Sequence, residues 1–367
     1  MSRPAVLFGG PSPEHDVSVI TGLMAARALG DVECIYWSKS GELFSVDEGL
    51  EAGDFVEGVP RKARPLRLQI GGDSGFVPEG GGLGKKKALD ITAVLNCCHG
   101  GPGEDGTLQG ALDLAGIRYT GPTAAGAALG MDKFAFAAAV TSAGLPHLPV
   151  AVVEPNVERP QPFDGPFILK PRFGGSSIGI QVLEDWASVQ AFVRSPQPLL
   201  RAGAVVEPYR PDSYDLNIAV RTHPELQLSA IEKPVRKTAG ASILDYKDKY
   251  VGGEGMVSAP RELPADIPDE WRERIRDAAA RIVAVAGVRG LARIDFLADG
   301  DDLYVNEINT IPGSLSIYLW IDPQVPVAQL LRDLLAEATT GPGRAYSTQG
   351  ADGSALRSAG SIAGKLG

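Results

Sequence analysis

Four polar side chains recur at alternate positions in the stretch RIDFLADGDDLYVNEINTIPGS, residues 293–314. Residues two apart on a β-strand point to the same face of a sheet, so Arg293 and Asp295 share a face, as do Glu307 and Asn309. The turn-rich sequence ADGDD between two apolar runs favours an antiparallel hairpin. If the two strands pair, all four side chains lie on one surface. The alternative is a polar side that only faces solvent.

The oxygen atoms of this set suit a magnesium ion. Mg²⁺ prefers carboxylates, amide oxygens and substrate phosphates, and Asp295, Glu307 and Asn309 supply two carboxylates and one amide. The strand also runs directly into a Pro-Gly turn at Gly313, whose backbone N–H can approach a ligand as an oxyanion site requires. We therefore predict a joint metal and phosphate site, with Arg293 beside it.

A second candidate phosphate contact is the stretch KPRFGGSSIGI, residues 170–180. Lys170 precedes a Gly-Gly-Ser-Ser turn, in which backbone amides and the hydroxyls of Ser176 and Ser177 can surround phosphate oxygens. The sequence has no Walker loop of the form G-x-x-x-x-G-K-[ST]. An ordinary flexible hairpin turn is the alternative for this stretch.

Two further loops follow apolar runs near the N-terminus. CCHGGPGEDGTLQG, residues 97–110, opens a helix at the place where open α/β sheets bind ligands, and it makes His99 a candidate polar contact. GGPSPEHDVS, residues 9–18, has the same setting, with Glu14 placed to accept a hydrogen bond from an amine. The alternatives are a structural histidine and ordinary capping of a helix start.

The elements that must position these residues begin with a doubly wound α/β unit. The apolar runs AVLFGG, VECIYW and ITAVLNCC alternate with predicted helices, one of them from about residue 18 to 29, which indicates a parallel sheet. Residues 71–87 are rich in glycine and lysine, and we expect a solvated loop or hairpin tip there.

Composition shifts divide the chain into three units and a tail. The α/β unit covers residues 1–130, a small α+β unit residues 131–225, and a third unit with a long amphipathic helix residues 226–340. Residues 341–367 are small, polar and rich in glycine, so we expect a mobile tail without a role in the chemistry.

Composition excludes several classes of protein. The 367 residues are 44% hydrophobic and 22% charged, which is typical of a globular protein of two or three domains. A formal charge of −10 argues against a nucleic-acid binder. Three cysteines inside apolar runs indicate reduced core residues, and no run is long enough to span a membrane. We expect a cytoplasmic protein.

Taken together, the motifs resemble those of the D-alanine:D-alanine ligase family, within the ATP-grasp superfamily. The resemblance covers residues 4–338, and its motifs recur in the order of the family: GGPSPEHDVS, HGGPGEDGTLQG, YTGP, MDK, KPRFGGSSIGI, DYKDKY, ARIDF and NEINTIPG. It implies a doubly wound preATP-grasp α/β domain followed by a two-part α+β ATP-grasp fold. It also implies a homodimer and the joining of two D-amino acids through an acyl phosphate.

The resemblance assigns roles to individual residues. ATP would lie between the second and third units, and two Mg²⁺ ions, with Mn²⁺ as a substitute, would be held by Asp295, Glu307 and Asn309. Glu14 would bind the ammonium group of the first amino acid and form a hydrogen-bonded trio with Ser176 and Tyr250, while His99 would lie near the second. The remaining implied contacts are Lys133, Lys170 and Lys249 to phosphates, Glu207 to adenine, Asp215 to ribose, and Arg293 and Gly313 to the tetrahedral oxygen.

The sequence departs from the family in two places. After Gly313 the segment SLSIYLW is several residues shorter than usual, which leaves Ser314 and Ser316 as candidates to bind the carboxylate of the second amino acid. The stretch ILDYKDKY carries Lys247 where an acidic residue is customary. D-alanine is the simplest substrate for both positions. The alternatives are a different acceptor in a specialised pathway, or a regulatory module that binds ATP without turnover.

Overall fold

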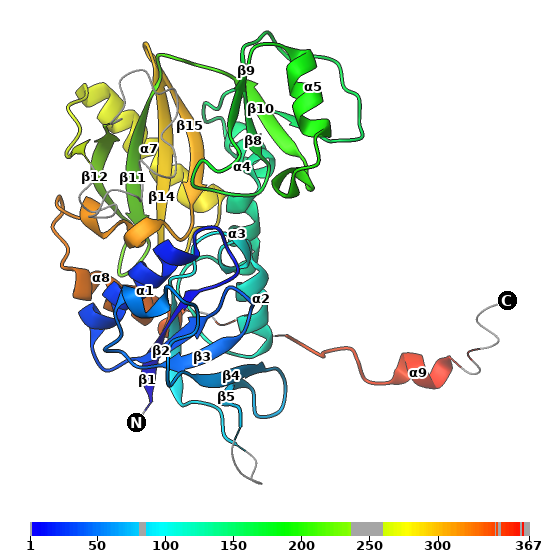
Figure 1. Ribbon diagram of the computed structural model, residues 1–367, viewed down its shortest axis with the longest axis vertical. Coiled ribbons are helices and arrows are strands. Elements are labelled where there is room, and N and C mark those ends of the chain that lie inside the picture. The colour runs from blue at the N-terminus through cyan, green and yellow to red at the C-terminus, as the bar shows by residue number, and fades with distance from the viewer. Residues whose placement is uncertain are drawn as a thin grey trace.

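A computed structural model gives the fold of this protein as three β-sheets with helices packed against them (Figure 1). The sheets follow one another along the chain, and the helices α3 and α4 run between the first sheet and the other two. Among the residues described, no helix is both long enough and apolar enough to cross a membrane. The structure describes residues 2–80, 86–235, 260–341, 343, 346–359 and 362.

The first sheet has six strands in the order β5-β4-β3-β2-β1-β6. Strand β1 pairs in parallel with β2 and β6, and its alternating side chains enter two different cores. Val6 and Phe8 pack on the side covered by α1 and α8, whereas Ala5 and Leu7 pack on the side covered by α2. The bounds are β1 Arg3–Gly9, α1 His15–Leu29, β2 Glu33–Trp37, β3 Leu43–Val46, β4 Arg64–Gln69, β5 Gly75–Pro78, β6 Ile91–Asn96, α2 Thr107–Leu114 and α8 Val327–Thr340.

The expected parallel pairing of the three apolar runs is confirmed, because they form β1, β2 and β6. Strands β3, β4 and β5, which were not predicted, extend the sheet from β2 as an antiparallel meander. No α-helix intervenes between these strands in residues 38–74, and short connections can join only antiparallel neighbours. The stretch 71–87, expected to be a loop or hairpin tip, contains the edge strand β5, while its residues 81–85 lie outside the described part.

The second sheet has four strands in the order β7-β10-β8-β9 and is covered by α5. Helix α4 enters this unit with Asp132 as its N-cap, whose Oδ1 accepts hydrogen bonds from the backbone N–H groups of Phe134 and Ala135 at 3.1 and 3.2 Å. The cap fixes the first turn of α4, which carries Lys133. The bounds are α3 Ala124–Met131, α4 Lys133–Ser142, β7 Ala151–Val153, β8 Phe167–Pro171, β9 Gln181–Leu183, α5 Trp186–Arg194 and β10 Ala204–Pro208.

The third sheet has five strands in the order β13-β12-β11-β14-β15. Its two faces differ, because β14 alternates core residues such as Ile294 and Phe296 with the polar residues Arg293 and Asp295. Helix α7 buries its apolar side against the core face. The polar face is therefore left for a ligand. The bounds are β11 Tyr214–Arg221, β12 Gln227–Pro234, β13 Arg261–Glu262, α7 Asp269–Val285, β14 Leu291–Asp299 and β15 Asp302–Asn309.

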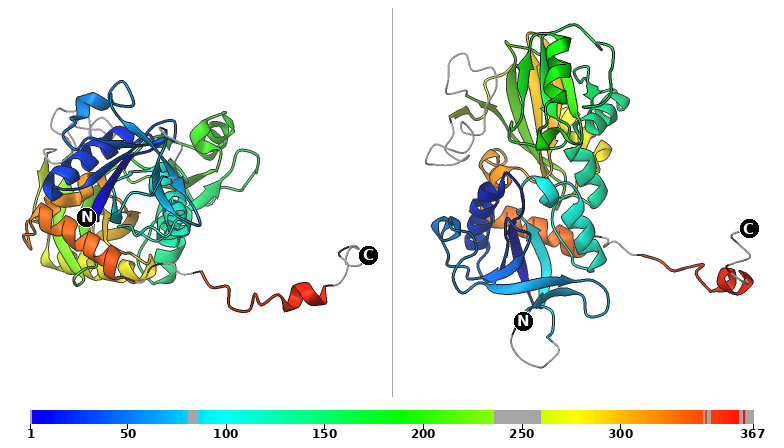
Figure 2. Two further views of the ribbon diagram at one scale, coloured as in Figure 1. Left: turned by 90° about the horizontal axis from the view of Figure 1, so that it is seen from below. Right: turned by 45° about the vertical axis from the view of Figure 1, so that its right-hand side comes forward.

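The sheets divide the chain differently from the expected unit boundaries. Residue 225 falls inside the third sheet, between β11 and β12, and α8 packs against β6 and α1 of the first unit. The C-terminal helix α9 (Ser354–Ser358) extends away from the rest of the protein in every view (Figures 1 and 2). The last packed helix of the chain thus completes the core in which the first strand lies.

Candidate active site

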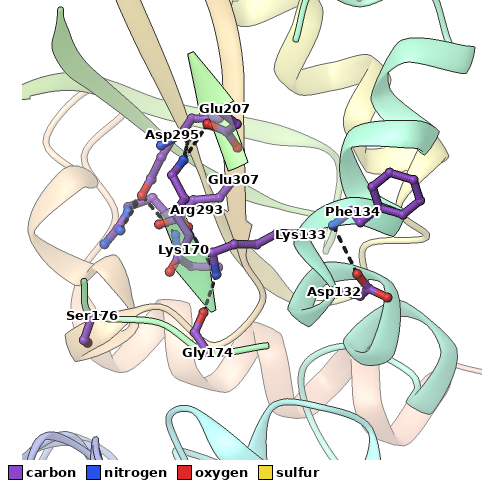
Figure 3. A network of polar contacts seen from close by, with 12 residues as sticks. Asp132, Lys133, Phe134, Lys170, Gly174, Ser176, Glu207, Arg293, Asp295 and Glu307 are labelled. Atoms are coloured by element: carbon purple, nitrogen blue, oxygen red, sulfur yellow. Dashed lines mark hydrogen bonds and ion pairs between the residues drawn. The ribbon is translucent and has the colours of Figure 1, made fainter. Parts of the chain in front are cut away.

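One continuous cavity lies between the second and third sheets and is closed at one end by loops of the first unit. The first unit contributes Glu14 and His99, and the Gly-Gly-Ser-Ser turn after β8 contributes Ser176 and Ser177. Most of the residues singled out from the sequence line this cavity, although they are distant along the chain (Figure 3). The other predicted site residues that line the cavity are Lys133, Lys170, Glu207, Asp215, Arg293, Asp295, Glu307, Asn309 and Gly313.

The hairpin predicted from alternating polar residues is confirmed. Strands β14 and β15 are antiparallel, with Asp295 opposite Glu307 and Arg293 opposite Asn309. The Arg293 guanidinium donates from Nε and Nη2 to the two oxygens of Asp295 at 2.6 and 2.7 Å, and Asn309 Nδ2 donates to Asp295 Oδ2 at 3.0 Å. Although burial acts to lower the pKa of Arg293, the charge of Asp295 raises it, so the guanidinium stays protonated.

The chemistry of this set fits a divalent cation that is shared with a phosphate ligand. Among the described residues, no three His, Cys, Asp or Glu side chains gather closely enough to form a protein-only metal site. Mg²⁺ is usually held by one or two carboxylates together with substrate phosphates, and Asp295 and Glu307 are two carboxylates beside two lysines. The amide of Asn309 adds a third oxygen. These three residues therefore match the donor set of such a site.

The two lysines approach the hairpin from different elements. Lys133 Nζ, at the start of α4, donates to Gly174 O and lies 4.0 Å from Glu307 Oε2. Burial lowers the pKa of Lys133, and the charge of Lys170 adds to this effect. Lys170 Nζ, near the end of β8, donates to Glu207 Oε2 at 2.8 Å and to Asn306 Oδ1 at 3.1 Å. Two ammonium groups, one buried on Lys170 and one partly buried on Lys133, thus lie on the side of the hairpin carboxylates (Figure 3).

The turn between β8 and β9 brings the first unit to the cavity. Ser176 and Ser177 both adopt left-handed backbone angles, with φ of 52° and 58°, which curl the turn so that both line the cavity. The Ser176 hydroxyl donates to Glu14 Oε1. The expected pair of Glu14 and Ser176 is therefore in contact, and it joins the start of α1 to the turn.

Glu207 and Asp215 line the cavity from β10 and β11, and each lies opposite an apolar cavity residue of the neighbouring strand, Ile168 and Leu297 respectively. We call this part of the cavity the apolar slot. A flat ring with polar edges suits such a slot, because apolar walls cover its faces while a few polar groups fix its orientation. The apolar side chains that line the cavity include Met131, Phe136, Leu148, Ile168, Leu297 and Ile308.

His99 lines the cavity and also ties two units together. Its imidazole ring is buried, with Nδ1 2.7 Å from Ile311 O and Nε2 2.9 Å from Thr21 Oγ1. Burial lowers the pKa of His99. This position agrees with both interpretations of His99 from the sequence, a contact in the site and a structural histidine.

Glu104 is a cavity residue that the sequence analysis missed. Its buried carboxylate accepts hydrogen bonds from the backbone N–H groups of Gly100 at 2.9 Å and Ile311 at 2.8 Å. Burial, with the nearby charge of Glu14, raises the pKa of Glu104 to about 7. An isolated acid in a glycine-rich loop has no periodic pattern, and its partner Ile311 is 207 residues away, so the sequence offered no sign of it.

A second missed group surrounds Glu232 on β12. Asn217 stands opposite both Asp295 and Glu232, so the three residues form one row across β14, β11 and β12. Glu232 Oε1 accepts from Asn217 Nδ2 at 3.0 Å and from the Tyr318 hydroxyl at 3.1 Å, and Oε2 accepts from Arg261 Nη1 at 3.0 Å. A charged residue inside the apolar run LQLSAIEKP was the one available sign in the sequence.

The short segment after Gly313, Gly313–Leu319, forms a tight turn whose 3₁₀ geometry is interrupted at three residues. Ser314, Leu315 and Ser316 have φ of 50°, 49° and 45°, and this left-handed turn buries Leu315 in the core and brings Tyr318 to the cavity. Gly313 lines the cavity, whereas the two serines are buried in the turn and are not among its lining residues. Two further expected contacts, Lys249 and Tyr250, lie outside the described residues.

Comparison with known proteins gives a consistent result. Family models described as D-ala D-ala ligase N-terminus and C-terminus match residues 3–122 and 139–335. A D-alanine–D-alanine ligase of Campylobacter lari is 32% identical over 320 residues, which cover 86% of this chain and 89% of that protein. A D-alanine–D-alanine ligase of Nocardia farcinica is 31% identical, with 92% of this chain and 98% of that protein covered.

Solved structures show the same fold at lower sequence identity. The VanG D-Ala:D-Ser ligase of Enterococcus faecalis superimposes with a TM-score of 0.73 at 24% identity, covering 92% of this chain and 99% of that one. This likeness supports the ATP-grasp architecture that the motifs predicted. With both family models matched along most of its length, the chain belongs to the D-Ala–D-Ala ligase family of ATP-dependent ligases.

Proposed function

We propose that this protein joins two D-amino acids, most simply two molecules of D-alanine, into a dipeptide for peptidoglycan precursor synthesis. The observation that carries the proposal is the convergence on one cavity of Arg293, Asp295 and Glu307 from the hairpin with Lys133 and Lys170. Such a set of charges stabilises a transferring phosphoryl group. Members of this family use ATP and a divalent metal.

In the first step a carboxylate oxygen of the donor amino acid attacks the γ-phosphorus of ATP, and ADP leaves. Lys133, Lys170 and the turn carrying Ser177 bind the phosphates, and Lys249 joins them. Glu207 binds the adenine amino group within the apolar slot, and Asp215 binds the ribose hydroxyls. Apolar side chains and the two lysines support these roles, because they line the same cavity and suit a flat ring and a chain of phosphates respectively.

In the second step the acceptor amine attacks the carbonyl carbon of the acyl phosphate, loses a proton, and inorganic phosphate leaves. Arg293 and the Gly313 N–H stabilise the negative tetrahedral oxygen. Glu14 binds the ammonium group of the donor and, with Ser176 and Tyr250, keeps water from the acyl phosphate. The contact between Glu14 and Ser176 supports this role, since it joins the first unit to the turn that lines the cavity.

The metal supplies positive charge that neutralises the phosphates. Asp295, Glu307 and Asn309 would hold it, with two ions of Mg²⁺ bound and Mn²⁺ as a substitute. Arg293 balances the charge of Asp295, and its protonated state is kept by the same contact. His99 contributes to the wall near the acceptor amino acid. A homodimer in the cytoplasm remains our prediction for the assembled enzyme.

A panel of amino acids tests this function. The purified protein is mixed with ATP, Mg²⁺ and single or paired D- and L-amino acids, and ADP and products are identified by chromatography and mass spectrometry. The proposal predicts one dipeptide and one phosphate for each ADP, with D-alanine among the active substrates. ATP binding without turnover in any mixture would instead support the regulatory module.

One observation favours a second candidate, the same ligase chemistry with a different acceptor. The turn after Gly313 is short, and neither Ser314 nor Ser316 is among the described residues that line the cavity. If a group other than these serines binds the acceptor amino acid, the preferred acceptor can differ from D-alanine. In the panel, this candidate predicts a mixed dipeptide formed faster than D-alanyl-D-alanine.

A further inference from the structure

The second step of the proposed reaction needs a group that takes up a proton. An acceptor amino acid reaches the site as an ammonium ion, whose nitrogen has no lone pair with which to attack. Two protons leave this nitrogen before the amide is complete, and the departing phosphate accounts for one of them. The other proton requires a base beside the reacting carbon.

The reacting carbon must lie close to Glu14. Only the α-carbon separates the ammonium group of the donor amino acid from its carboxyl carbon, and Glu14 is the group proposed to bind that ammonium. A side chain at Gly100 would collide with Glu14 Oε2, so this glycine lies directly against the Glu14 carboxylate. The Gly100 backbone N–H donates to Glu104 Oε2 at 2.9 Å. One glycine thus contacts both carboxylates, and a base at Glu104 would lie beside the reacting carbon.

Only neutral groups hold the Glu104 carboxylate within the part of the chain that the structure describes. Oε1 accepts from the Ile311 N–H at 2.8 Å and from the Thr310 hydroxyl at 3.3 Å, and Oε2 accepts from the Gly100 N–H. A carboxylate offers roughly four lone-pair sites, so the remaining site lies on Oε2, the oxygen next to Gly100. The side chain is buried and lines the cavity, where a substrate proton can reach it.

We propose that Glu104 is the general base of the second step and takes a proton from the ammonium group of the acceptor amino acid. The inference rests on the proposed ligase function. Once Oε2 has taken the proton, the nitrogen lone pair forms the C–N bond, and the bond from the acyl carbon to the phosphate oxygen breaks. Phosphate leaves with that electron pair and takes the second proton of the nitrogen. Glu104 later passes its own proton to water.

The charges around Glu104 favour proton uptake. Burial, together with the charge of Glu14 at the start of α1, raises the pKa of Glu104 to about 7. His99 in the same loop is uncharged at neutral pH, because burial lowers its pKa. The nearest cation of β14, Arg293, acts on His99 and is hydrogen-bonded to Asp295. A base with a pKa near the working pH is both ionised enough to take a proton and basic enough to hold it.

His99 is not available as the base, because both nitrogens of its ring are used. The carbonyl oxygen of Ile311 can only accept, so His99 Nδ1 carries the hydrogen and donates at 2.7 Å. In the neutral ring Nε2 then accepts from the Thr21 hydroxyl at 2.9 Å. His99 therefore fixes the Ile311 backbone, whose N–H group Glu104 binds.

The other described carboxylates of the cavity have different partners. Glu14 and Asp215 are assigned to the donor ammonium group and to ribose. Four more face cations, and a proton delivered to one of these would leave its cation without a counter-charge, which is costly inside a protein. The four pairs are Glu207 with Lys170, Glu232 with Arg261, Asp295 with Arg293, and Glu307 with Lys133.

Hydroxylamine as a competing acceptor tests the proposal. Unlike an amino acid, it is uncharged at neutral pH, so it attacks an acyl phosphate without first losing a proton and gives a hydroxamate. We would supply ATP, Mg²⁺, D-alanine and hydroxylamine together and measure D-alanyl-D-alanine and D-alanyl hydroxamate by mass spectrometry. Glu104→Gln should lower the ratio of dipeptide to hydroxamate roughly 100-fold or more. Because both products come from one active site, the ratio does not depend on how much protein is folded.

The pH dependence of dipeptide formation distinguishes a base from a structural group. In wild-type protein the rate should rise with pH up to about 7, where Glu104 is ionised, and then level off. Glu104→Gln depends on the uncharged fraction of the acceptor in solution, so its rate should continue to rise above that value. Glu104→Asp retains a carboxylate, and it should recover part of the product ratio and the levelling. This variant also serves if Glu104→Gln does not fold.

The matched control is the next residue of the same loop. Asp105 Oδ1 accepts from the Thr107 backbone N–H at 2.8 Å, and its side chain is not among the described residues that line the cavity. Asp105→Asn removes the same charge one residue away. The product ratio and the pH profile of this variant should stay close to those of wild-type protein.

The outcomes separate the inference from the function on which it rests. If wild-type protein forms both products and Glu104→Gln keeps the wild-type ratio, the inference is overturned and the proposed function stands. A lower ratio with an unchanged pH profile would also overturn it, because Glu104 would then only position the acceptor. If another amino acid replaces D-alanine, the test uses that amino acid. If no amino acid gives either product, the proposed function and the inference fail together.

Discussion

Glu307 illustrates how one side chain can be tested without disturbing the fold. Its carboxylate lines the cavity, 30% exposed, and lies 4.0 Å from Lys133 Nζ. Glu307→Gln keeps the shape and removes the charge, so we expect turnover to fall by roughly 100-fold or more, because a bound cation contributes several kcal/mol to charge stabilisation. Steady-state ADP release, with the melting temperature measured in parallel, checks this.

The matched control for this change is Asp302→Asn at the far end of the same strand. The Asp302 carboxylate accepts from the Tyr304 hydroxyl at 3.2 Å and is exposed. Its loss should leave turnover nearly unchanged. Near-normal activity in Glu307→Gln would refute the role of this carboxylate as a metal ligand.

The buried carboxyl group of Glu104 should make the stability of the folded protein depend on pH. Its pKa is about 7 in the folded protein, above the ordinary value of 4.5, because of burial and the charge of Glu14. The folded state therefore binds more protons than the unfolded state between these values, and this group's stabilising contribution is lost as the pH rises from about 4.5 to 7. The full change is on the order of 3 kcal/mol.

Unfolding measurements at several pH values can isolate this contribution. Glu104→Gln cannot titrate, so the stability of wild-type protein relative to this variant should fall from pH 5 to pH 8 and stay level above it. Thermal melting of both proteins in matched buffers gives the comparison. Parallel curves for the two proteins across this range would contradict the account of Glu104.

At the scale of elements, an ion pair joins the two segments that carry the cavity lysines. Arg172 donates from Nε and Nη2 to the two oxygens of Asp132 at 2.9 and 2.7 Å, and the Lys133 backbone N–H donates to Arg172 O at 3.2 Å. The start of α4 is thereby tied to the end of β8, which carries Lys170. We infer that this tie sets the spacing of the two lysines.

Arg172→Leu removes the ion pair but keeps the backbone hydrogen bond and both lysine side chains. The pair is partly exposed, so its loss should cost about 1 kcal/mol and raise the KM for ATP roughly fivefold, with the KM for amino acids changed much less. Kinetics with ATP and amino acid varied separately measure this. Arg159→Leu, which removes an exposed pair with Glu154 on the same unit, is the control. Equal changes in both KM values would indicate a general loss of structure.

Elements could be predicted where a local pattern determines them. Alternating polar residues and a turn-rich connection were enough for the β14–β15 hairpin and for the shared face of Arg293 and Asp295. The antiparallel meander was missed, because β3, β4 and β5 are short or rich in polar residues and were not predicted as strands. Direction followed here from the lack of a crossover helix between the strands.

At the scale of the whole molecule, the order of the motifs predicted the family and the position of the cavity. The sequence could not indicate contacts whose partners are distant, such as Glu104 with Ile311, Glu232 with Tyr318, or α8 with the first sheet. These contacts need three units folded together, since no local spacing encodes them.

The central claim is that the cavity transfers a phosphoryl group to a carboxylate before the peptide bond forms. Donor amino acid labelled with ¹⁸O in its carboxylate tests this most directly. Our account predicts that one labelled oxygen appears in inorganic phosphate for each dipeptide formed, because the attacking oxygen leaves with phosphorus. Label found in AMP, or dipeptide formed without any label in phosphate, would contradict it.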